Sequence, residues 1–383
     1  MATIKKYTKK DGSTAYMFNA YLGTDPMTGK QKRTTRRGFT TVKEAKLALS
    51  RLQVDIEENG FTKQKSTTFK ELYELWYESV YKNTVKESTR VKKTEMFTNH
   101  ILPAFGKLKI DKISVKYCQK VVNQWCEKLV AYREVKNNVT RVLDYAITLG
   151  LLADNPMKKI VMPKRKEVVN DEKIENYFSK DELQTFLDYA KQDLPMKWFV
   201  FFRLQAFSGF RKGESLALTW RDIDFKANTI AITKTLARGE NNTLIIQTPK
   251  TKSSVRTISI DTTTMAILKE WRKKQALDMF KMGFNTNNEK QLVFSTLDNK
   301  PINHSNTTNY INKVIKRYDL KPVTVHGLRH THCSLLFEAG APIQVVKERL
   351  GHSDIQTTMN IYTHVTQKAK EDTAEKFAKY VNF

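Results

Sequence analysis

Two polar segments without a regular apolar pattern constrain the fold most, because they divide the chain into parts that must each bury a core of their own. The first covers residues 61–67, and the second, residues 161–175, reads V-M-P-K-R-K-E-V-V-N-D-E-K-I-E. A chain of 383 residues exceeds one typical domain, which agrees with this division. We therefore expect domains at residues 1–60, 68–160 and 176–383, joined by two linkers.

The charge of the chain indicates a polyanionic partner. Its 66 Lys and Arg outnumber its 40 Asp and Glu, for a formal net charge of +26, and nucleic-acid binding is the usual reason to tolerate such self-repulsion. A polybasic membrane protein is the alternative, but no apolar run approaches the roughly 18 residues of a spanning helix. The N-terminal sequence M-A-T-I-K-K-Y lacks an apolar signal core. Cys118, Cys126 and Cys333 are few and scattered, which indicates a reducing compartment, the cytoplasm. Cys118 and Cys126 lie on an apolar helical pattern, so we interpret these two as buried free thiols.

Residues 1–60 show three short strand patterns followed by a helix pattern. We expect strands at residues 4–8, 15–21 and 31–39 and a helix at residues 42–58. A three-stranded sheet backed by one helix is too small for a catalytic centre, but it suits insertion into a DNA major groove. The candidate DNA-binding residues on the third strand are Arg33, Arg36 and Arg37, and a solvated basic surface is the alternative interpretation.

Residues 68–160 carry four helical patterns and should form an all-α domain. We expect helices near residues 69–80, 88–102, 117–129 and 135–147, with the second ending before Pro103. Their apolar stripes are interpreted as core. Basic side chains on and between the helices could contact a DNA backbone, and the candidates are Lys92, Lys93 and Arg141.

Residues 176–383 should form a mainly α domain with a small antiparallel sheet, which makes the whole chain a multidomain α+β protein. The domain opens with a capping-box sequence, Ser179 to Glu182, and continues with a buried helix around residues 198–207. Arg211 falls between that helix and a new one near residue 213. Three strands at residues 229–235, 244–248 and 254–260 follow, with P-K-T-K-S-S as a basic hairpin tip between the last two. Helices near residues 265–280 and 303–317, a strand at 292–295 and an amphipathic tail helix at 369–383 complete the domain; the tail could dock on a neighbouring protomer or on its own domain.

The stretch from His326 to Tyr362 combines side chains suited to phosphodiester chemistry. Its first part, V-H-G-L-R-H-T-H-C-S-L-L, places His326 and Arg329 on one face of a helix. A second helix, residues 343–350, should end at Gly351, directly before His352. Arginine offers a planar fork to phosphate oxygens, histidine can move protons near neutral pH, and tyrosine can act as a nucleophile.

A zinc site is the alternative for these histidines, because His326 and His330 are four residues apart. No H-E-x-x-H, Cys pair or carboxylate third ligand accompanies them in the sequence. We therefore expect no metal, and we interpret His330 and His332 as helix-packing residues.

The sequence H-x-L-R-H-T-H followed by L-G-H-x(9)-Y resembles the tyrosine recombinase (phage integrase) family. Residues 208–224, S-G-F-R-K-G-E-S-L-A-L-T-W-R-D-I-D, are similar to that family's first catalytic-arginine motif, and G-L-L-A-D-N-P at residues 150–156 is similar to the close of its core-binding domain. Residues 1–60 resemble the arm-type DNA-binding unit of integrases from Gram-positive phages and conjugative transposons. The resemblance implies an ordered set of catalytic residues: Arg211, Lys250, His326, Arg329, His352 and Tyr362.

The roles of the basic residues follow from this resemblance. Arg211 grips the scissile phosphate, and Glu214 supports the site by hydrogen bonding. Lys250 protonates the leaving 5′ oxygen, although Lys252 is so close that spacing alone does not separate the two. Two arginines and a histidine would stabilise the charge on the nonbridging oxygens, so that no metal or other cofactor is required.

The chemistry expected is cleavage and rejoining of DNA without ATP. Tyr362 attacks the phosphorus to give a 3′-phosphotyrosine and a free 5′-hydroxyl, His326 accepts the phenol proton, and His352 donates to a phosphate oxygen. The family acts as a tetramer through a Holliday junction, often with a small excisionase and a host DNA-bending protein. We expect an integrase at core-type and arm-type attachment sites in the bacterial cytoplasm, associated with the nucleoid. A host chromosome-dimer recombinase, a type IB topoisomerase and a non-catalytic DNA-binding regulator are the alternatives.

Overall fold

The computed structural model describes residues 3–9, 11–24, 29–59, 67–165, 175–356 and 358–359. The chain forms two compact units, one of Met1–Val85 with Thr94–Lys166 and one of Lys86–Lys93 with Glu167–Phe383. Tyr362, the tail at 369–383 and most of both expected linkers lie outside the described residues.

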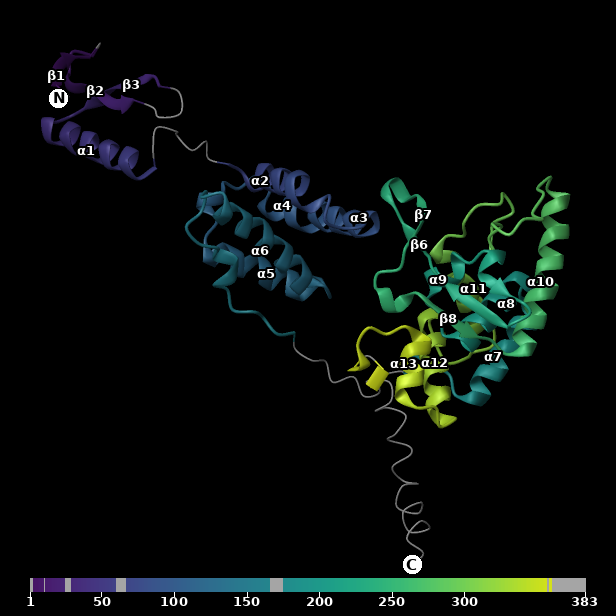
Figure 1. Ribbon diagram of the computed structural model, residues 1–383. Coiled ribbons are helices and arrows are strands. Elements are labelled where there is room, and N and C mark those ends of the chain that lie inside the picture. The colour runs from purple at the N-terminus through teal and green to yellow at the C-terminus, as the bar shows by residue number, and fades with distance from the viewer. Residues whose placement is uncertain are drawn as a thin grey trace, which may run out of the picture. The chain divides into compact units, whose positions relative to one another are not determined.

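The first unit begins with a three-stranded antiparallel sheet, as the alternation of its sequence predicts. Strands β1 (Thr3–Thr8), β2 (Thr14–Thr24) and β3 (Gln31–Phe39) lie in the order β1-β2-β3, followed by helix α1 (Val42–Asn59). Phe18 and Ala20 on β2 and Ala45 on α1 are buried together, so the helix covers one face of the sheet (Figure 1). The prediction of a sheet and one helix is confirmed.

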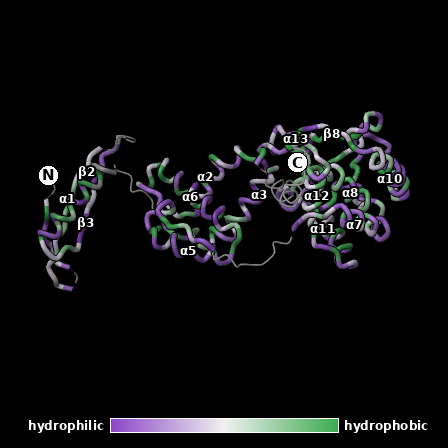
Figure 2. The backbone as a smooth tube through the Cα atoms, turned by 90° about the horizontal axis from the view of Figure 1, so that it is seen from below, coloured by the Kyte–Doolittle hydropathy of each residue, from purple (hydrophilic) through white to green (hydrophobic). Residues whose placement is uncertain are grey.

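Four helical segments with a separate apolar core follow. Helix α2 (Phe69–Trp76) continues into a π-helical turn, Tyr77–Tyr81, and α3 (Glu87–Met96) continues through a second π turn, Phe97–Ile101, into α4 (Leu102–Phe105). Helices α5 (Val115–Lys128) and α6 (Tyr132–Thr148) complete the set, together with short 3₁₀ turns at Ile110–Lys112 and Pro156–Lys158. Hydrophobic and hydrophilic residues alternate along these helices (Figure 2), as expected for one buried and one solvated face.

The predicted end before Pro103 is wrong. The helical path continues to Phe105, with Pro103 in the first turn of α4. Proline is tolerated in a first turn because the amide it lacks would have no partner within the helix.

The second unit is built around helix α8 (Met196–Ser208), whose side chains are buried on nearly every side. Helices α7 (Lys180–Asp193), α10 (Thr262–Lys281) and α12 (Val325–Glu338) pack against it, as Figure 1 shows. The short helix α9 (Lys212–Leu216), α11 (His304–Arg317) and α13 (Ile343–Leu350) complete the helical part. The predicted capping box is confirmed, since Ser179 and Glu182 each bond the other's backbone amide at the start of α7.

The strands of this unit are paired differently from the expectation. Strands β4 (Ile223–Asp224), β5 (Thr229–Ile232) and β8 (Arg256–Ser259) form one sheet, whereas β6 (Thr235–Arg238) and β7 (Leu244–Gln247) form a separate hairpin that projects from the helices in Figure 1. The segment P-K-T-K-S-S is therefore not a hairpin tip but a connection between two sheets, and that prediction is wrong. Alternating polar and apolar residues identify a strand but not the strand it pairs with. Here the chain leaves the first sheet after Ile232, forms the β6–β7 hairpin, and rejoins the first sheet only at β8. A 3₁₀ turn, Lys252–Ser254, lies in the connection; two others are Trp220–Asp222 and Glu240–Asn242.

The prediction of a strand at residues 292–295 is also wrong. The structure has only isolated bridges there, from Thr219 to Leu292 and from Ser295 to Pro301. The prediction that Cys118 and Cys126 are buried free thiols is confirmed, and Cys333 is free and buried as well. Within the described ranges, no helix has the length and apolar character that crossing a membrane requires. The mixed α+β class is confirmed.

Candidate active site

The first candidate arginine stands where α8 gives way to α9. Helix α8 ends at Gly209, whose φ of 66° lies in the left-handed region, and Arg211 is the extended N-cap residue of α9. Nη1 of Arg211 donates to Oε1 of Glu214 at 2.8 Å and to Oγ of Ser254 at 3.2 Å, and Nη2 donates to the carbonyl oxygen of Gly351 at 3.0 Å. The side chain is still 37% exposed, so a ligand at the surface can reach it.

The second candidate arginine approaches the same place from below the surface. Arg329, on α12, is 2% exposed, and its Nη1 and Nη2 donate to the carbonyl oxygens of Gly209 at 2.6 Å and Leu350 at 2.8 Å. Leu350 and Gly351 are neighbours in sequence, so the two guanidinium groups meet at the C-terminal end of α13. Burial, and next the charge of Arg211, lowers the pKa of Arg329 to about 9, which leaves it charged at neutral pH. The negative end of the helix dipole offsets part of the cost of pairing two cations.

Two histidines share this positive environment. His326 faces the surface at the start of α12, with its ring edge-on to His330 at 4.8 Å between centroids. His352 follows the left-handed Gly351, and its Nδ1 lies 2.9 Å from Oγ1 of Thr358. Partial burial of the rings, and next the nearby positive charges, lower the pKa of His326 to about 4 and that of His352 to about 3. Both rings are therefore neutral at pH 7 and can accept or donate a proton.

Arg211 and Arg329 are among the charges that depress both histidine pKa values, which places all four side chains in one neighbourhood. The structure thus brings together four of the six residues that the sequence singled out. Lys250 is exposed in the connection between β7 and β8, and Lys252 is exposed in the following turn. Tyr362 lies outside the described residues.

Two further arginines support the site by hydrogen bonding, and sequence analysis did not identify them. Arg256, at the start of β8, donates from Nη2 to Oε2 of Glu214 at 3.0 Å, so that this 2% exposed carboxylate stands between Arg211 and Arg256. Burial would raise the pKa of Glu214, but the charge and hydrogen bond of Arg256 bring it below its usual value. Arg349 donates from Nε to Nε2 of His332 at 3.0 Å. No local pattern marks either arginine, because their partners come from distant parts of the chain.

His332 packs inside the unit, as predicted. It is 8% exposed, and its Nδ1 lies 2.8 Å from the carbonyl oxygen of Ala206. Among the described residues there is no group of three or more His, Cys, Asp or Glu placed to hold a metal ion.

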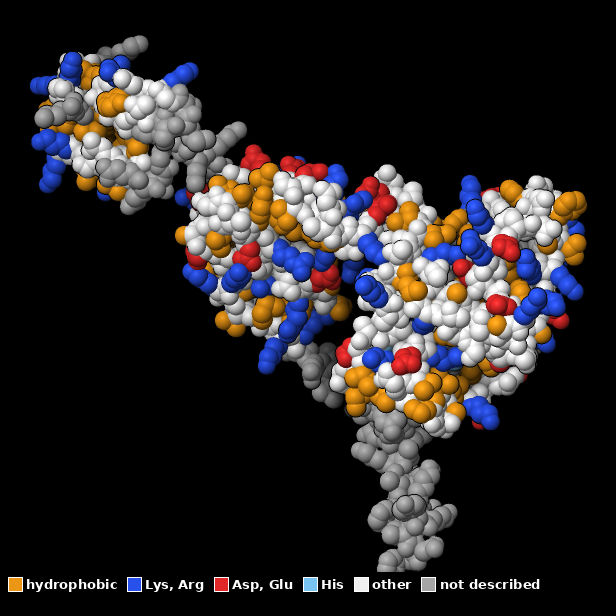
Figure 3. Space-filling view, viewed as in Figure 1, with side chains coloured by type: hydrophobic (Ala, Val, Ile, Leu, Met, Phe, Trp, Pro, Cys, Tyr) orange, Lys and Arg blue, Asp and Glu red, His pale blue; other side chains and the backbone are white. Residues whose placement is uncertain are grey.

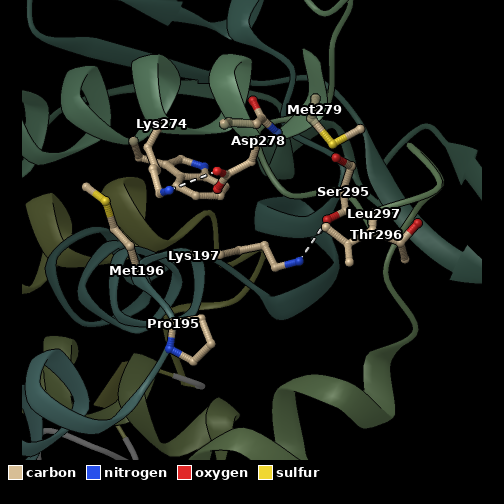
Figure 4. Close-up of a pocket in the computed structure, with 11 residues that line it drawn as sticks. Pro195, Met196, Lys197, Lys274, Asp278, Met279, Ser295, Thr296 and Leu297 are labelled. Atoms are coloured by element: carbon tan, nitrogen blue, oxygen red, sulfur yellow. Dashed lines mark hydrogen bonds and ion pairs between the residues drawn. The ribbon is translucent and has the colours of Figure 1, made fainter. Parts of the chain in front are cut away.

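A separate pocket of about 270 Å³ lies at the other end of α8 and includes none of the four site residues. Figure 4 shows Lys197 pointing across it to the carbonyl oxygen of Ser295, 3.0 Å away, and Lys274 paired with Asp278. The candidate site instead opens to the surface through Arg211 and His326, with Arg329 beneath them, which suits a polyanion lying across it better than an enclosed small molecule.

The three candidate arginines of β3 are exposed, and Figure 3 shows Lys and Arg side chains around the edge of the N-terminal domain. Arg33 and Arg37 pair with Tyr21 and Met17 across the sheet, whereas Arg36 pairs with the buried Phe18. Directly opposed residues point to the same face, so Arg36 is on the α1 side and the other two are on the open side. Because successive side chains of a strand point to opposite faces, the sequence alone could have separated Arg36 from Arg33 and Arg37. The remaining candidates lie on α3 and α6; Lys92 and Arg141 are exposed and Lys93 is half-buried.

Comparisons with known proteins agree with this architecture. The phage integrase family model matches residues 176–369, a phage integrase N-terminal SAM-like domain matches residues 68–126, and an arm DNA-binding domain matches residues 3–56. A XerC-like tyrosine recombinase of Caldanaerobacter subterraneus subsp. tengcongensis is 31% identical over 96% of both chains. The ICEBs1 integrase of Bacillus subtilis is 27% identical, covering 96% of this chain and 98% of its own.

The fold also matches a solved Tn1549 transposon integrase in complex with a circular intermediate DNA. The TM-score is 0.67 at 21% identity, over 82% of this chain and 100% of that one. Fold and family matches together define the class as tyrosine-type site-specific DNA recombinases. The chain belongs to the phage integrase family.

Proposed function

We propose that this protein is the integrase of a temperate phage or integrative element, and that it cuts and rejoins attachment-site DNA through a 3′-phosphotyrosine. The observation that carries the proposal is the meeting of Arg211 and Arg329 at the adjacent carbonyls of Gly351 and Leu350, beside the neutral His352. Two fixed cations there would stabilise the charge that builds on the nonbridging oxygens of a scissile phosphate. Arg211 is the accessible donor, and Arg329 adds its charge from beneath.

Two histidines and a lysine carry the proposed proton transfers. The bond from the Tyr362 oxygen to phosphorus forms as the bond to the 5′ oxygen breaks; His326 takes the phenol proton, and Lys250 gives a proton to the leaving oxygen. A histidine whose pKa lies near 4 is unprotonated at pH 7 and can accept that proton. His352 donates to a nonbridging oxygen. Attack by a 5′-hydroxyl from another duplex reverses these transfers and completes strand exchange.

The experiment is adduct formation on DNA. After the covalently attached nucleotide is mapped on candidate attachment DNA, a nicked suicide duplex of that sequence should trap a protein–DNA adduct. Tyr362→Phe should bind the duplex and form no adduct, whereas the control Tyr380→Phe should form it normally. An adduct from Tyr362→Phe would overturn the assignment.

We propose a division of labour along the chain: residues 1–60 bind arm-type sites, residues 68–160 bind core-type DNA, and residues 176–383 carry the chemistry. Because Arg33 and Arg37 share the open face of the sheet, Arg37→Ala should weaken binding to isolated arm DNA at least about tenfold. The matched control is Arg36→Ala on the other face, which should change affinity less than about threefold. Equal effects of the two substitutions would refute this use of the sheet.

The basic residues Lys92, Lys93 and Arg141 are proposed to contact phosphates of the core site, so binding should weaken steeply with salt. Assembly on DNA as a homotetramer, action in the bacterial cytoplasm at the nucleoid, and help from an excisionase and a host DNA-bending protein complete the proposal. A host-type recombinase is the second candidate, favoured by the XerC-like relative. Recombination between the ends of the protein's own element, rather than at a chromosomal dimer site, separates the two. Strand exchange between two sites would exclude a topoisomerase, and adduct formation would exclude a non-catalytic regulator.

A further inference from the structure

Arg256 occupies a central place that the mechanism above does not use. It begins β8, its side chain is 7% exposed, and it donates to three separate parts of the unit. Nη2 reaches Oε2 of Glu214 at 3.0 Å, Nε reaches the carbonyl oxygen of Arg349 at 2.7 Å, and Nη1 reaches the carbonyl oxygen of Ser254 at 2.9 Å. Its guanidinium also lies over the ring of Phe210, 5.6 Å from the centroid. A buried arginine with this many fixed contacts sets the geometry around it.

The first consequence concerns the charge of Arg211. Oε1 of Glu214 accepts from the Arg211 side chain, while Oε2 accepts from Arg256 and from the Arg211 backbone amide at 2.9 Å. The carboxylate is thus shared between two guanidinium groups. Without Arg256, this 2% exposed carboxylate would keep, among the described residues, Arg211 alone as an ion-pair partner, and it would neutralise the charge of Arg211. Arg256 therefore leaves Arg211 with positive charge to offer a phosphate.

The second consequence concerns the turn that follows α13. Through the carbonyl of Arg349, Arg256 holds the end of the helix whose next two carbonyls accept from Arg329 and Arg211. It also packs closely against Gly351, where an added Cβ would come within 3.1 Å of its Cδ. His352 leaves from this turn. One side chain thus touches both the carboxylate and the backbone that aim the two site arginines.

We propose that Arg256 is a positioning residue for strand cleavage, holding Glu214 and the Arg349–Gly351 turn so that Arg211 presents its free guanidinium face to the scissile phosphate. The inference rests on the proposed function and extends it to a buried side chain that acts through the residues it holds.

The test compares single-turnover adduct formation at saturating concentrations of the mapped nicked suicide duplex. Arg256→Met should slow adduct formation about 100-fold, and Arg256→Lys, which keeps the charge but not the three-way contact, about tenfold, with DNA affinity within about threefold of wild type. Arg272→Met is the matched control, because Arg272 also stacks on an aromatic ring, that of Trp220, away from the site. It should react at the wild-type rate.

A double-variant cycle separates positioning from a general loss of structure. In an Arg211→Lys background, adding Arg256→Met should slow the reaction less than about threefold, because both changes act on the same contact to the phosphate. A full 100-fold further loss, or a wild-type rate in folded Arg256→Met, would overturn the inference and leave the proposed function standing. If Arg256→Met does not fold, Arg256→Lys takes its place. A wild-type rate of Arg256→Lys, or its full tenfold loss again in the Arg211→Lys background, would then overturn the inference. No adduct from the wild-type protein would overturn the proposed function and this inference with it.

Discussion

Acidification should destabilise the second unit through His332. The imidazole has two fixed partners, the carbonyl oxygen of Ala206 at Nδ1 and the Nε–H of Arg349 at Nε2. A carbonyl only accepts and the Arg349 Nε–H only donates, so the ring must be neutral and carry its proton on Nδ1. A second proton on Nε2 would point at a guanidinium donor.

The size of the effect follows from the pKa. Burial, and next the charge of Arg349, lowers the pKa of His332 from its usual 6.5 to about 3. Because the unfolded chain takes up the proton first, this contribution to stability is complete above pH 6.5 and is lost as the pH falls from there toward 3. At pH 4.5, about two pH units into this window, the loss amounts to about 3 kcal/mol.

The assay is urea-induced unfolding at a series of pH values between 4.5 and 8. Hydrogen exchange of peptides from α8 and α12 then shows whether the loss of stability lies in this part of the second unit. Other histidines add their own pH dependence, so His332 is isolated by comparing the wild type with His332→Asn. Below pH 6.5, the free energy of unfolding of this variant should depend on pH less steeply than that of the wild type, by the slope that corresponds to one proton. Parallel pH profiles for wild type and His332→Asn would refute the reasoning.

Three further outcomes are expected. Glu214→Gln removes a buried carboxylate from between two arginines, so the free energy of unfolding should fall by roughly 3 kcal/mol and the adduct-forming rate by about 100-fold; urea titration and the suicide substrate measure the two, and a stable, fully active variant would contradict the pairing. Gly351→Ala places a Cβ 2.8 Å from the carbonyl oxygen of Ser253 at a φ of 68°, so it should lose about 1–3 kcal/mol in the same titration, and wild-type stability would count against the tight turn. Burial raises the pKa of the Cys118 thiol to about 11 and that of Cys333 to about 12, so a thiol reagent at pH 8 should label them only after urea unfolding; labelling of either in the native protein would contradict their burial.

Local patterns were enough wherever the physical cause is local. The strands and helix of residues 1–60 follow from alternation and turn residues, the start of α7 from its capping box, and the end of α13 from Gly351, which adopts the left-handed conformation. Spacing along one helix also placed His326 and Arg329 in one neighbourhood. Even the opposite faces of Arg36 and Arg37 could have been read from the period of the strand.

By itself, the sequence determined the class of each segment, the excess of positive charge and the order of the residues suited to phosphodiester chemistry. Tertiary structure decided which strand pairs with which, so that the Lys250 segment became a link between two sheets and β8 brought Arg256 to Glu214. It also decided that Arg211 and Arg329, more than a hundred residues apart, meet at the carbonyls of one turn. The physical reason is that propensity and periodicity act over a few residues, whereas a buried charge finds its partners only after the chain has closed around it.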